Sequence, residues 1–414
     1  MYQDNHIPAL RFKGFEGKWE ERKLGEVAQV TMGQSPDGST YSNKPGGSIL
    51  VQGNADIKNG WVEPRVWTTQ ITKQADAGDL IMSVRAPAGA MGKTAYDVVI
   101  GRGVAAIQGN EFLYQLLVKR DIDGLWKQVS SGSTFDALNA ENIKSTDIYI
   151  PSTEEQNKIG AYLEKLDLLI SLQHQKLDKL EDFKKAMLDK MFPQKGSRVP
   201  EIRFQGFAGV WEEKKFSELY AKRNDKNDLT YGPEKIISVA NMYYKPDAYI
   251  TDPNYFLTYN VFELGDIAFE GNKSKSYAHG RFVENTIGNG IVSHVFDVFR
   301  PIMNSYDLFF WKYAINNESL MGKILIRCTK SSIMMNNLVA HDFLEESFLV
   351  PSIQEQEQIG AFLNSLDRLL SLHRQKLEKL KAFKKAMLGQ MFPPERAAKS
   401  TSTLLTPALD QDTL

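Results

Sequence analysis

The longest regular pattern in this sequence is a pair of stretches in which apolar residues recur at alternating three- and four-residue steps. This spacing places the recurring side chains on one face of an α-helix, and such a seam, sustained over several turns, is typical of a coiled coil. The pattern therefore predicts two long helices that pair through their seams. The predicted seam residues are Leu163, Leu166, Ile170, Gln173, Leu177 and Leu180, and Leu363, Leu366, Leu370, His373, Leu377 and Leu380.

The two stretches are copies of one another. Pro151 to Pro193 and Pro351 to Pro393 are identical at 27 of 43 aligned positions. Each begins with the spacing of a capping box, Ser152 with Glu155 in the first copy, in which hydroxyl and carboxylate satisfy each other's exposed backbone donors. Each ends at a Phe-Pro pair, because proline cannot continue a helix. Matching start and stop signals predict matching helices.

The regions before the two helices also repeat, and there the pattern changes to that of strands. Residues 8–26 and 200–218 match at 11 of 19 positions. Further on, short runs such as GDLIMSV and GDIAFE carry β-forming residues between Gly, Asn and Asp, which predicts mixed α/β domains. Shorter helices are predicted over residues 111–118 and 306–315. The chain is therefore a tandem repeat of a globular module followed by a long helix.

The repeat divides the chain into five segments, with a direct connection between the modules. Only the six residues QKGSRV separate Pro193 from Pro200, so the first helix must deliver the chain almost directly to the second domain. We predict globular domains over residues 1–150 and 194–350, long spacer helices over 151–193 and 351–393, and a disordered tail over 394–414.

This connectivity predicts how the helices run. If they pair through their seams, the second must return antiparallel to the first, giving approximate two-fold symmetry. The expected fold class is α+β, with two mixed α/β globular domains separated by two long antiparallel coiled-coil helices. Residues 154–192 would span about 58 Å as a helix at roughly 1.5 Å per residue, more than the ~34 Å of one DNA turn. Two domains held in this way could reach separated sites on one duplex.

Composition narrows the function classes without selecting one. Fifty basic and 51 acidic residues give a formal net charge of −1, so for any contact with nucleic acid the basic residues must be gathered locally or supplied by partners. The single cysteine, Cys328, rules out a disulfide framework and is expected to be a buried thiol. The first residues lack the basic and apolar regions of a secretory signal, and no run of about twenty apolar residues occurs. We expect a cytoplasmic protein.

The order and duplication of these features resemble the specificity subunit of type I restriction-modification systems, over residues 1–395. The matching motifs are the W-E-x-x-x-[LF]-x-E starts at Trp19 and Trp211, the P-S-x-x-E-Q helix starts, the pairs Leu166-Asp167 and Leu366-Asp367, and the K-L-x-K-L-x-x-F-K-K-A-M-L endings.

The resemblance implies a function for each part. In that family the globular parts are target recognition domains, each reading one half of a bipartite double-stranded DNA target. The helices fix the gap between the halves and dock two copies of an adenine methyltransferase subunit, and a motor-nuclease subunit joins for cleavage. S-adenosylmethionine is expected on the methyltransferase, and no cofactor on this chain. A two-domain coiled-coil adaptor that binds protein partners without reading bases is the alternative.

The sequence offers little catalytic chemistry of its own. PAGAMGKT, residues 87–94, resembles a phosphate-binding loop but has Pro87 where the first glycine is required, and a strand pattern follows it instead of a helix. The tetrapeptide of adenine methyltransferases is absent, and the six histidines show no metal-binding spacing with Cys328. We therefore expect no catalytic residue and no metal site, and a non-catalytic recognition subunit.

Candidate DNA contacts are Arg, Lys, Asn, Gln, His, Ser and Thr side chains in glycine-flanked polar stretches, because such groups on loops read base edges and phosphates. GNKSKSYAHGR, residues 271–281, is the best single stretch, although each residue could equally be an ordinary surface group. The candidates are Gln34, Ser35, Lys44, Arg85, Lys93, Ser131, Ser133 and Thr134 in the first module, and Asn272, Lys273, Ser274, Lys275, Ser276, His279, Arg281, Lys330, Ser331, Ser332 and Asn336 in the second.

Two features of the helices carry further hypotheses. Gln173 and His373 lie at the middle of each seam, where a polar layer could fix the register of an antiparallel pair, or simply form an exposed edge. The Met- and Phe-rich helix ends exceed what one seam needs, so they either pack on the neighbouring domain or dock the methyltransferase. These partner-docking candidates are Phe183, Met187, Met191, Phe383, Met387 and Met391.

Overall fold

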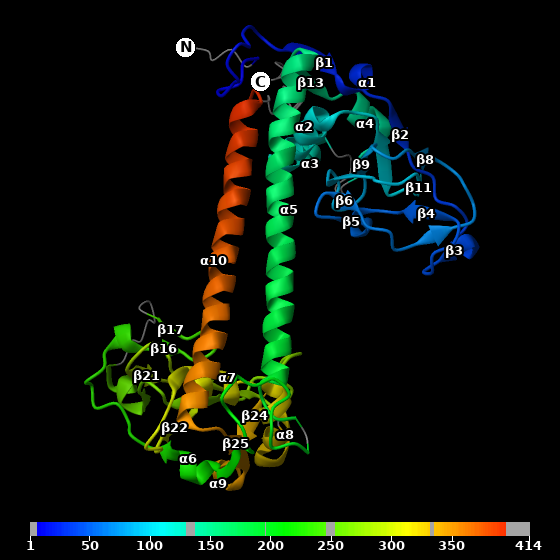
Figure 1. Cartoon of the computed structure of the whole chain (residues 1–414). Coiled ribbons are helices and arrows are strands. Elements are labelled where there is room, and N and C mark those ends of the chain that lie inside the picture. Colours follow the sequence, from blue (N-terminus) through cyan, green and yellow to red (C-terminus); the bar gives the residue numbers. More distant parts are fainter. Residues whose placement is uncertain (1–5, 130–136, 195, 246–252, 332–334, 395–414) are drawn as a thin grey trace, which may run out of the picture. The chain divides into compact units, whose positions relative to one another are not determined.

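The computed structural model describes residues 6–129, 137–194, 196–245, 253–331 and 335–394. The chain divides into two units, each containing one globular region and parts of both long helices (Figure 1). Unit 1 consists of Met1–His174 and Gln375–Leu414, and unit 2 of Gln175–Arg374. The globular region of unit 1 is called domain 1, and that of unit 2 domain 2.

Domain 1 is built on two sheets with mixed strand directions. The first has the strand order β2-β12-β9-β10-β6-β5 and the second β3-β7-β4-β11-β8. A separate antiparallel pair, β1 with β13, joins the start of the domain to its end. The strands are β1 (Glu20–Lys23), β2 (Val30–Met32), β3 (Tyr41–Ser42), β4 (Ser48–Val51), β5 (Ile57–Lys58), β6 (Trp61–Val62), β7 (Trp67–Thr68), β8 (Gln74–Ala75), β9 (Leu80–Ser83), β10 (Met91–Lys93), β11 (Val98–Ile100), β12 (Val104–Ile107) and β13 (Asp147–Ile150).

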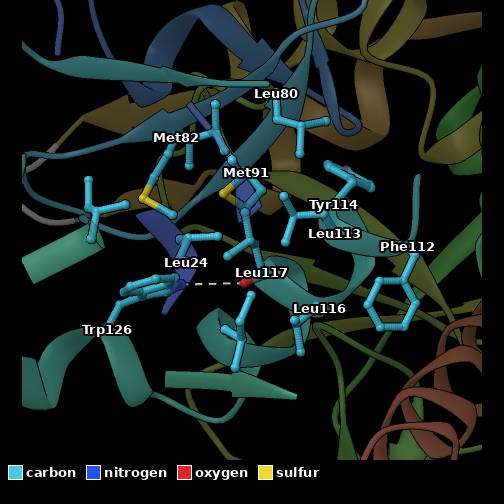
Figure 2. Packing of buried hydrophobic residues seen from close by; sticks show 14 of the residues in the cluster. Leu24, Leu80, Met82, Met91, Phe112, Leu113, Tyr114, Leu116, Leu117 and Trp126 are labelled. Carbon is cyan, nitrogen blue, oxygen red and sulfur yellow. Dashed lines mark hydrogen bonds between the residues drawn. The ribbon is translucent and has the colours of Figure 1, made fainter. Parts of the chain in front are cut away.

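Helix α2 supplies most of the helical side of the domain 1 core. It begins after Asn110, whose side chain accepts a hydrogen bond from Leu113 N at 3.0 Å. Figure 2 shows Leu113 and Leu117 of α2 among Leu24, Leu80, Met82 and Met91, while Trp126 Nε1 donates to Leu117 O at 3.3 Å. The helices are α1 (Leu24–Val27), α2 (Glu111–Ile122), α3 (Leu125–Val129) and α4 (Ala140–Lys144), with short 3₁₀ turns at Gly38–Thr40 and Asn54–Asp56.

Domain 2 repeats this plan with a smaller main sheet of order β15-β22-β19-β20. β14 pairs with β25 as β1 does with β13. Its strands are β14 (Glu212–Lys215), β15 (Tyr220–Arg223), β16 (Ile237–Ser238), β17 (Tyr243–Tyr244), β18 (Asn260–Phe262), β19 (Ile267–Glu270), β20 (Arg281–Glu284), β21 (Gly290–Val292), β22 (Asp297–Pro301), β23 (Thr329–Ser331), β24 (Asn336–Leu338) and β25 (Ser347–Val350). The helices are α6 (Phe216–Leu219), α7 (Leu308–Ile315), α8 (Glu318–Cys328) and α9 (Ala340–Glu345), with 3₁₀ turns at Pro233–Lys235 and Pro253–Thr258.

The central strands of the two domains are equivalent. β9 and β19 each follow a Gly-Asp turn and lie between two antiparallel neighbours. Leu80 in β9 faces Lys93, and Ile267 in β19 faces Glu284. The offset between the domains at these strands is 267 − 80 = 187 residues, so positions in one domain can be matched to positions in the other.

The long helices are α5 (Thr153–Lys190) and α10 (Ile353–Met391). In unit 1, Ile159 near the start of α5 and Met391 at the end of α10 lie in the same core, and further along Asp167 meets Lys384. The two helix parts therefore run antiparallel within this unit. In unit 2, Ile359 and Met191 share a core in the same way.

The seam positions are buried or half-buried throughout. Leu163, Leu166, Gln173, Leu177, Leu363, Leu366, Leu370 and Leu377 are buried, whereas Ile170, Leu180, His373 and Leu380 are half-buried. The fold class expected from the sequence, mixed α/β domains with long antiparallel helices in an internal repeat, is confirmed. The exact domain boundaries stay a prediction, and the tail from residue 395 lies outside the described residues.

The start of each long helix differs from the predicted capping box in one respect. Ser152 Oγ accepts a hydrogen bond from Glu155 N at 3.4 Å, as expected. The Glu155 carboxylate, however, receives Arg11 Nε at 2.6 Å and Nη2 at 2.8 Å. Arg203 and Glu355 repeat this bidentate pair in unit 2. The carboxylate thus ties the helix to the repeated module start, because a guanidinium matches both carboxylate oxygens.

Candidate nucleic-acid interface

The best sequence candidate, residues 271–281, forms the connection between β19 and β20 and the first residue of β20. Asn272, Lys273, Ser274, Lys275 and Ser276 are exposed, and His279 and Arg281 are half-buried. This connection thus presents a row of polar and basic side chains at one end of the main sheet of domain 2.

A hairpin from later in the chain packs against this loop. β23 and β24 pair antiparallel, with Lys330 opposite Asn337. Asn336 N donates to Gly271 O at 2.8 Å, Asn336 Nδ2 donates to Ala278 O at 3.1 Å, and Lys273 Nζ donates to Ser331 Oγ at 2.7 Å. Loop and hairpin therefore form one surface, although about 50 residues of sequence separate them.

The loop is also held from within and from α7. Tyr277 OH donates to Asn316 Oδ1 at 2.6 Å, at the C-terminal end of α7. The Arg281 guanidinium lies 5.1 Å from the centre of the Tyr277 ring and donates to Glu270 Oε2 at 2.7 Å. Arg281 is thus engaged in holding the loop, as is the buried Asn336.

Beside the loop lies a pocket of about 220 Å³ that opens at the same end of the sheet. Asn336 is 2% exposed, and its Oδ1 has no hydrogen-bond partner among the described residues. One residue of the pocket wall thus carries a buried acceptor without a partner among the described residues. Its lining residues are Phe269, Gly271, Asn272, Val295, Phe296, Asp297, Met335, Asn336, Asn337 and Leu338.

Domain 1 gathers part of its candidates at the equivalent end of its sheet. Arg85 follows β9, is exposed, and bridges Ala137. Gln34, exposed, and Ser35, half-buried, follow β2, which runs beside β12. Ser35 Oγ accepts a hydrogen bond from Arg102 N at 3.2 Å, in the turn that leads into β12. Since β12 lies between β2 and β9, these groups belong to one end of the sheet.

Two candidates of domain 1 lie elsewhere. Lys44 is exposed beside β3 of the other sheet. Lys93 is buried at the opposite end of the β9–β10 hairpin from Arg85. Its ammonium lies 2.7 Å from Glu111 Oε2 and over the rings of Trp61 and Tyr114 at 4.8 and 4.9 Å. Lys93 lines a cavity of about 390 Å³ between domain 1 and α5. The candidates Ser131, Ser133, Thr134 and Ser332 lie outside the described residues.

Sequence reasoning missed two exposed polar residues at these sites. Neither Arg102 nor Asn337 is among the candidates chosen from the sequence, yet Arg102 lies next to Ser35 and Asn337 faces Lys330. Arg102 lies between two glycines, and Asn337 follows another asparagine, Asn336. Only the strand order shows which end of the sheet they occupy.

The partner-docking candidates divide by burial. Met191 and Met391 are buried in the cores of units 2 and 1, and Met187 and Met387 pack beside them. Phe183 and Phe383 are 44% and 45% exposed. At the end of each long helix, the two methionines therefore pack into the core of the unit that contains that end, whereas the phenylalanine stays exposed.

The described residues show little that could serve catalysis. No group of three or more His, Cys, Asp or Glu side chains among them could hold a metal ion. Cys328 is buried, and burial raises its pKa to about 12. The PAGAMGKT segment, residues 87–94, itself contains strand β10, so it does not present the helix N-terminus of a phosphate-binding loop. None of the described helices is long and apolar enough to cross a membrane.

The decisive comparison is with protein families. The model of the type I restriction modification DNA specificity domain matches residues 16–182 and again residues 211–382. The chain belongs to this family. Both matches include a globular domain and most of the long helix that follows it, so the family's repeat coincides with the repeat found in the sequence.

Two kinds of relative agree with this family. A protein from Methanocaldococcus jannaschii, named for the specificity subunit of type I restriction enzyme MjaX, is 31% identical over 181 residues. The match covers 41% of this chain and 42% of that relative, so it spans about two fifths of the relative's length. Among solved structures, the type I restriction-modification S subunit from M. genitalium matches with a TM-score of 0.59 at 14% identity, covering 94% of this chain and 100% of that chain.

A second solved structure, from a study of complex assembly in a type I R-M system, has a TM-score of 0.51 at 17% identity and covers 89% of this chain and 96% of that chain. Because both identities are low, these two likenesses show that this chain shares the fold of those solved chains, and no more.

Proposed function

We propose that this specificity subunit reads a bipartite double-stranded DNA target, domain 1 one half and domain 2 the other. The observation that carries the proposal is the repeated sheet end, where loop 271–281 and the β23–β24 hairpin meet in domain 2, and where Arg85 and Ser35 follow β9 and β2 at the corresponding end in domain 1. Their exposed Arg, Lys, Asn and Ser side chains are the groups that read base edges and phosphates.

The long helices set the spacing between the two half-sites and dock the partners. Their near-identical sequences suit two identical subunits, which we propose are adenine methyltransferases that carry S-adenosylmethionine. The exposed Phe183 and Phe383 are the candidates for that contact. The polar seam positions Gln173 and His373 are proposed to fix the register of the helix pair. A motor-nuclease subunit would join this complex for DNA cleavage.

In this proposal the chain supplies recognition of the DNA sequence, and its partners supply the catalysis. The test is to purify the chain with an adenine methyltransferase partner and to map methylation on random DNA by sequencing. A bipartite methylated motif with a fixed gap supports the proposal. A complex that forms but methylates without sequence preference would favour the adaptor that binds only proteins.

A further inference from the structure

Arg85 of domain 1 and Asn272 of domain 2 occupy the same place in the repeated fold. Each lies five residues after an equivalent position of the central strand, Leu80 in β9 and Ile267 in β19. Their difference, 272 − 85 = 187, equals the offset of the strands themselves. The middles of the two modules differ most in sequence, yet the backbone at this position is equivalent in both modules.

The chain next to each residue is held by the same contacts. Arg85 bridges Ala137, and Asn272 bridges Met335. One residue along, Leu138 N donates to Val84 O at 2.9 Å, and Asn336 N donates to Gly271 O at 2.8 Å. The backbone at both positions is therefore held by an equivalent neighbouring segment, residues 137–138 in domain 1 and 335–336 in domain 2.

The two side chains themselves are available. Both are exposed, and neither makes a hydrogen bond or ion pair to another described residue. This separates them from Arg281, Lys93 and Asn336, whose polar groups already hold the fold. Each has an exposed basic residue in a neighbouring stretch as a candidate for phosphate contact. Arg102 precedes Gly103, whose carbonyl accepts a hydrogen bond from Val84 N, and Lys275 lies three residues after Asn272.

Arginine and asparagine have different preferences among bases. In the major groove the arginine fork matches O6 and N7 of guanine, and the asparagine amide matches N6 and N7 of adenine. We propose that Arg85 and Asn272 are specificity-determining residues, Arg85 reading a guanine in one half of the target and Asn272 an adenine in the other. This inference rests on the proposed function, since it names the residues by which each domain reads DNA.

The test uses the full chain in complex with its methyltransferase partner and a randomised double-stranded DNA library, sequenced after binding and after methylation. The variants are Arg85→Ala, Arg85→Lys and Asn272→Ala. Matched controls are Lys58→Ala, in β5 at the edge of the domain 1 sheet, and Asn304→Ala, beyond the opposite end of β22. Because all four of these side chains are exposed, the five variants should melt at the wild-type temperature.

We expect Arg85→Ala to lower discrimination for guanine at one position of one half-site by about 10- to 100-fold, the range that one bidentate contact supplies, and to leave the other half unchanged. Arg85→Lys should retain part of it, and Asn272→Ala should relax an adenine in the other half. Unchanged motifs in folded Arg85→Ala and Asn272→Ala complexes would overturn the inference. A wild-type complex without a bipartite motif would instead overturn the proposed function.

Discussion

Lys384 Nζ of α10 lies 2.5 Å from Asp167 Oδ1 of α5, and the other carboxylate oxygen of Asp167 accepts a hydrogen bond from Gln115 of α2 at 2.7 Å. One carboxylate thus joins both long helices to domain 1. Unit 2 repeats the arrangement, with Asp367 bound by Lys184 at 2.5 Å and by Tyr313 of α7 at 2.6 Å. Each lysine–aspartate contact thus links the two long helices at a defined pair of positions. We call each of these contacts, together with the bond from the aspartate to the domain, a junction.

Removing either lysine should weaken the helix pair. We expect Lys184→Ala and Lys384→Ala each to lower the free energy of unfolding by about 1–3 kcal/mol, since a partly buried carboxylate loses its charged donor. The neighbouring exposed lysines give controls, because Lys185→Ala and Lys385→Ala should change it by less than about 0.5 kcal/mol. Urea unfolding followed by circular dichroism measures the difference. Equal effects of paired and control lysines would show that the junction does not stabilise the pair.

The unit 2 junction should weaken in acid. Burial raises the pKa of Asp367, but hydrogen bonds from Lys184 and Tyr313 outweigh it, so the pKa lies below its usual value. A lowered carboxyl pKa contributes stability that is present above the unfolded pKa of about 3.9 and is lost as the pH falls through the folded value.

Asp367→Asn lacks this titration. The stability difference between wild type and Asp367→Asn should therefore shrink below about pH 4. Urea midpoints measured for both proteins across that range check it, and a difference that stays constant with pH would rule the contribution out.

Glu284 should be a source of instability at neutral pH. The side chain is 3% exposed, and neither carboxylate oxygen has a hydrogen-bond partner among the described residues. Burial and the nearby Asp307 raise its pKa well above the usual value, despite Lys312. With the folded pKa raised, the folded protein binds the extra proton, so stability declines as the pH rises above the unfolded value of about 4.3.

Glu284→Gln keeps the shape and removes the charge. At neutral pH this variant should raise the free energy of unfolding by about 1–3 kcal/mol, and the gain should disappear below about pH 4. Thermal melting at both pH values provides the measurement. A variant less stable than wild type at neutral pH would mean that the carboxylate has a stabilising partner.

The sequence predicted those parts of the fold that depend on local periodicity. The seam from Leu163 to Leu180 and the β9 run LIMS have clear periods or continuous apolar patterns, and the internal repeat supplies each signal twice. The Asp167–Lys384 pair lay beyond such reasoning, because the two residues are 217 positions apart and meet only once the helices have paired.

The candidate site was predictable as a composition but not as a geometry. The stretch from Gly271 to Arg281 stands out by its Lys, Ser and Asn content, yet nothing local distinguishes exposed Asn272 from Arg281, which holds the loop. Lys93 had the same signature and lies buried beside Glu111, since β10 carries it to the other end of the sheet. Side-chain roles here follow from strand order.

Gly271 should be essential for the shape of the domain 2 surface. A Cβ at this position would lie 2.1 Å from Asn336 O, so alanine must push the loop from the hairpin. We expect Gly271→Ala to weaken binding to the half-site of domain 2 by at least about tenfold without changing preference at the other half. Gly389→Ala, where a Cβ meets no atom within 4 Å, is the control. Equal binding by Gly271→Ala and wild type, measured by fluorescence anisotropy, would show that the hairpin does not shape the site.

The central claim is that domain 1 and domain 2 recognise the two halves of the DNA target independently. The most direct measurement replaces residues 1–150 with the corresponding domain of another family member and maps adenine methylation by the complex on random DNA. The account predicts that one half of the bipartite motif changes while the other half and the gap stay as in wild type. A change in both halves together, or in neither, would contradict it.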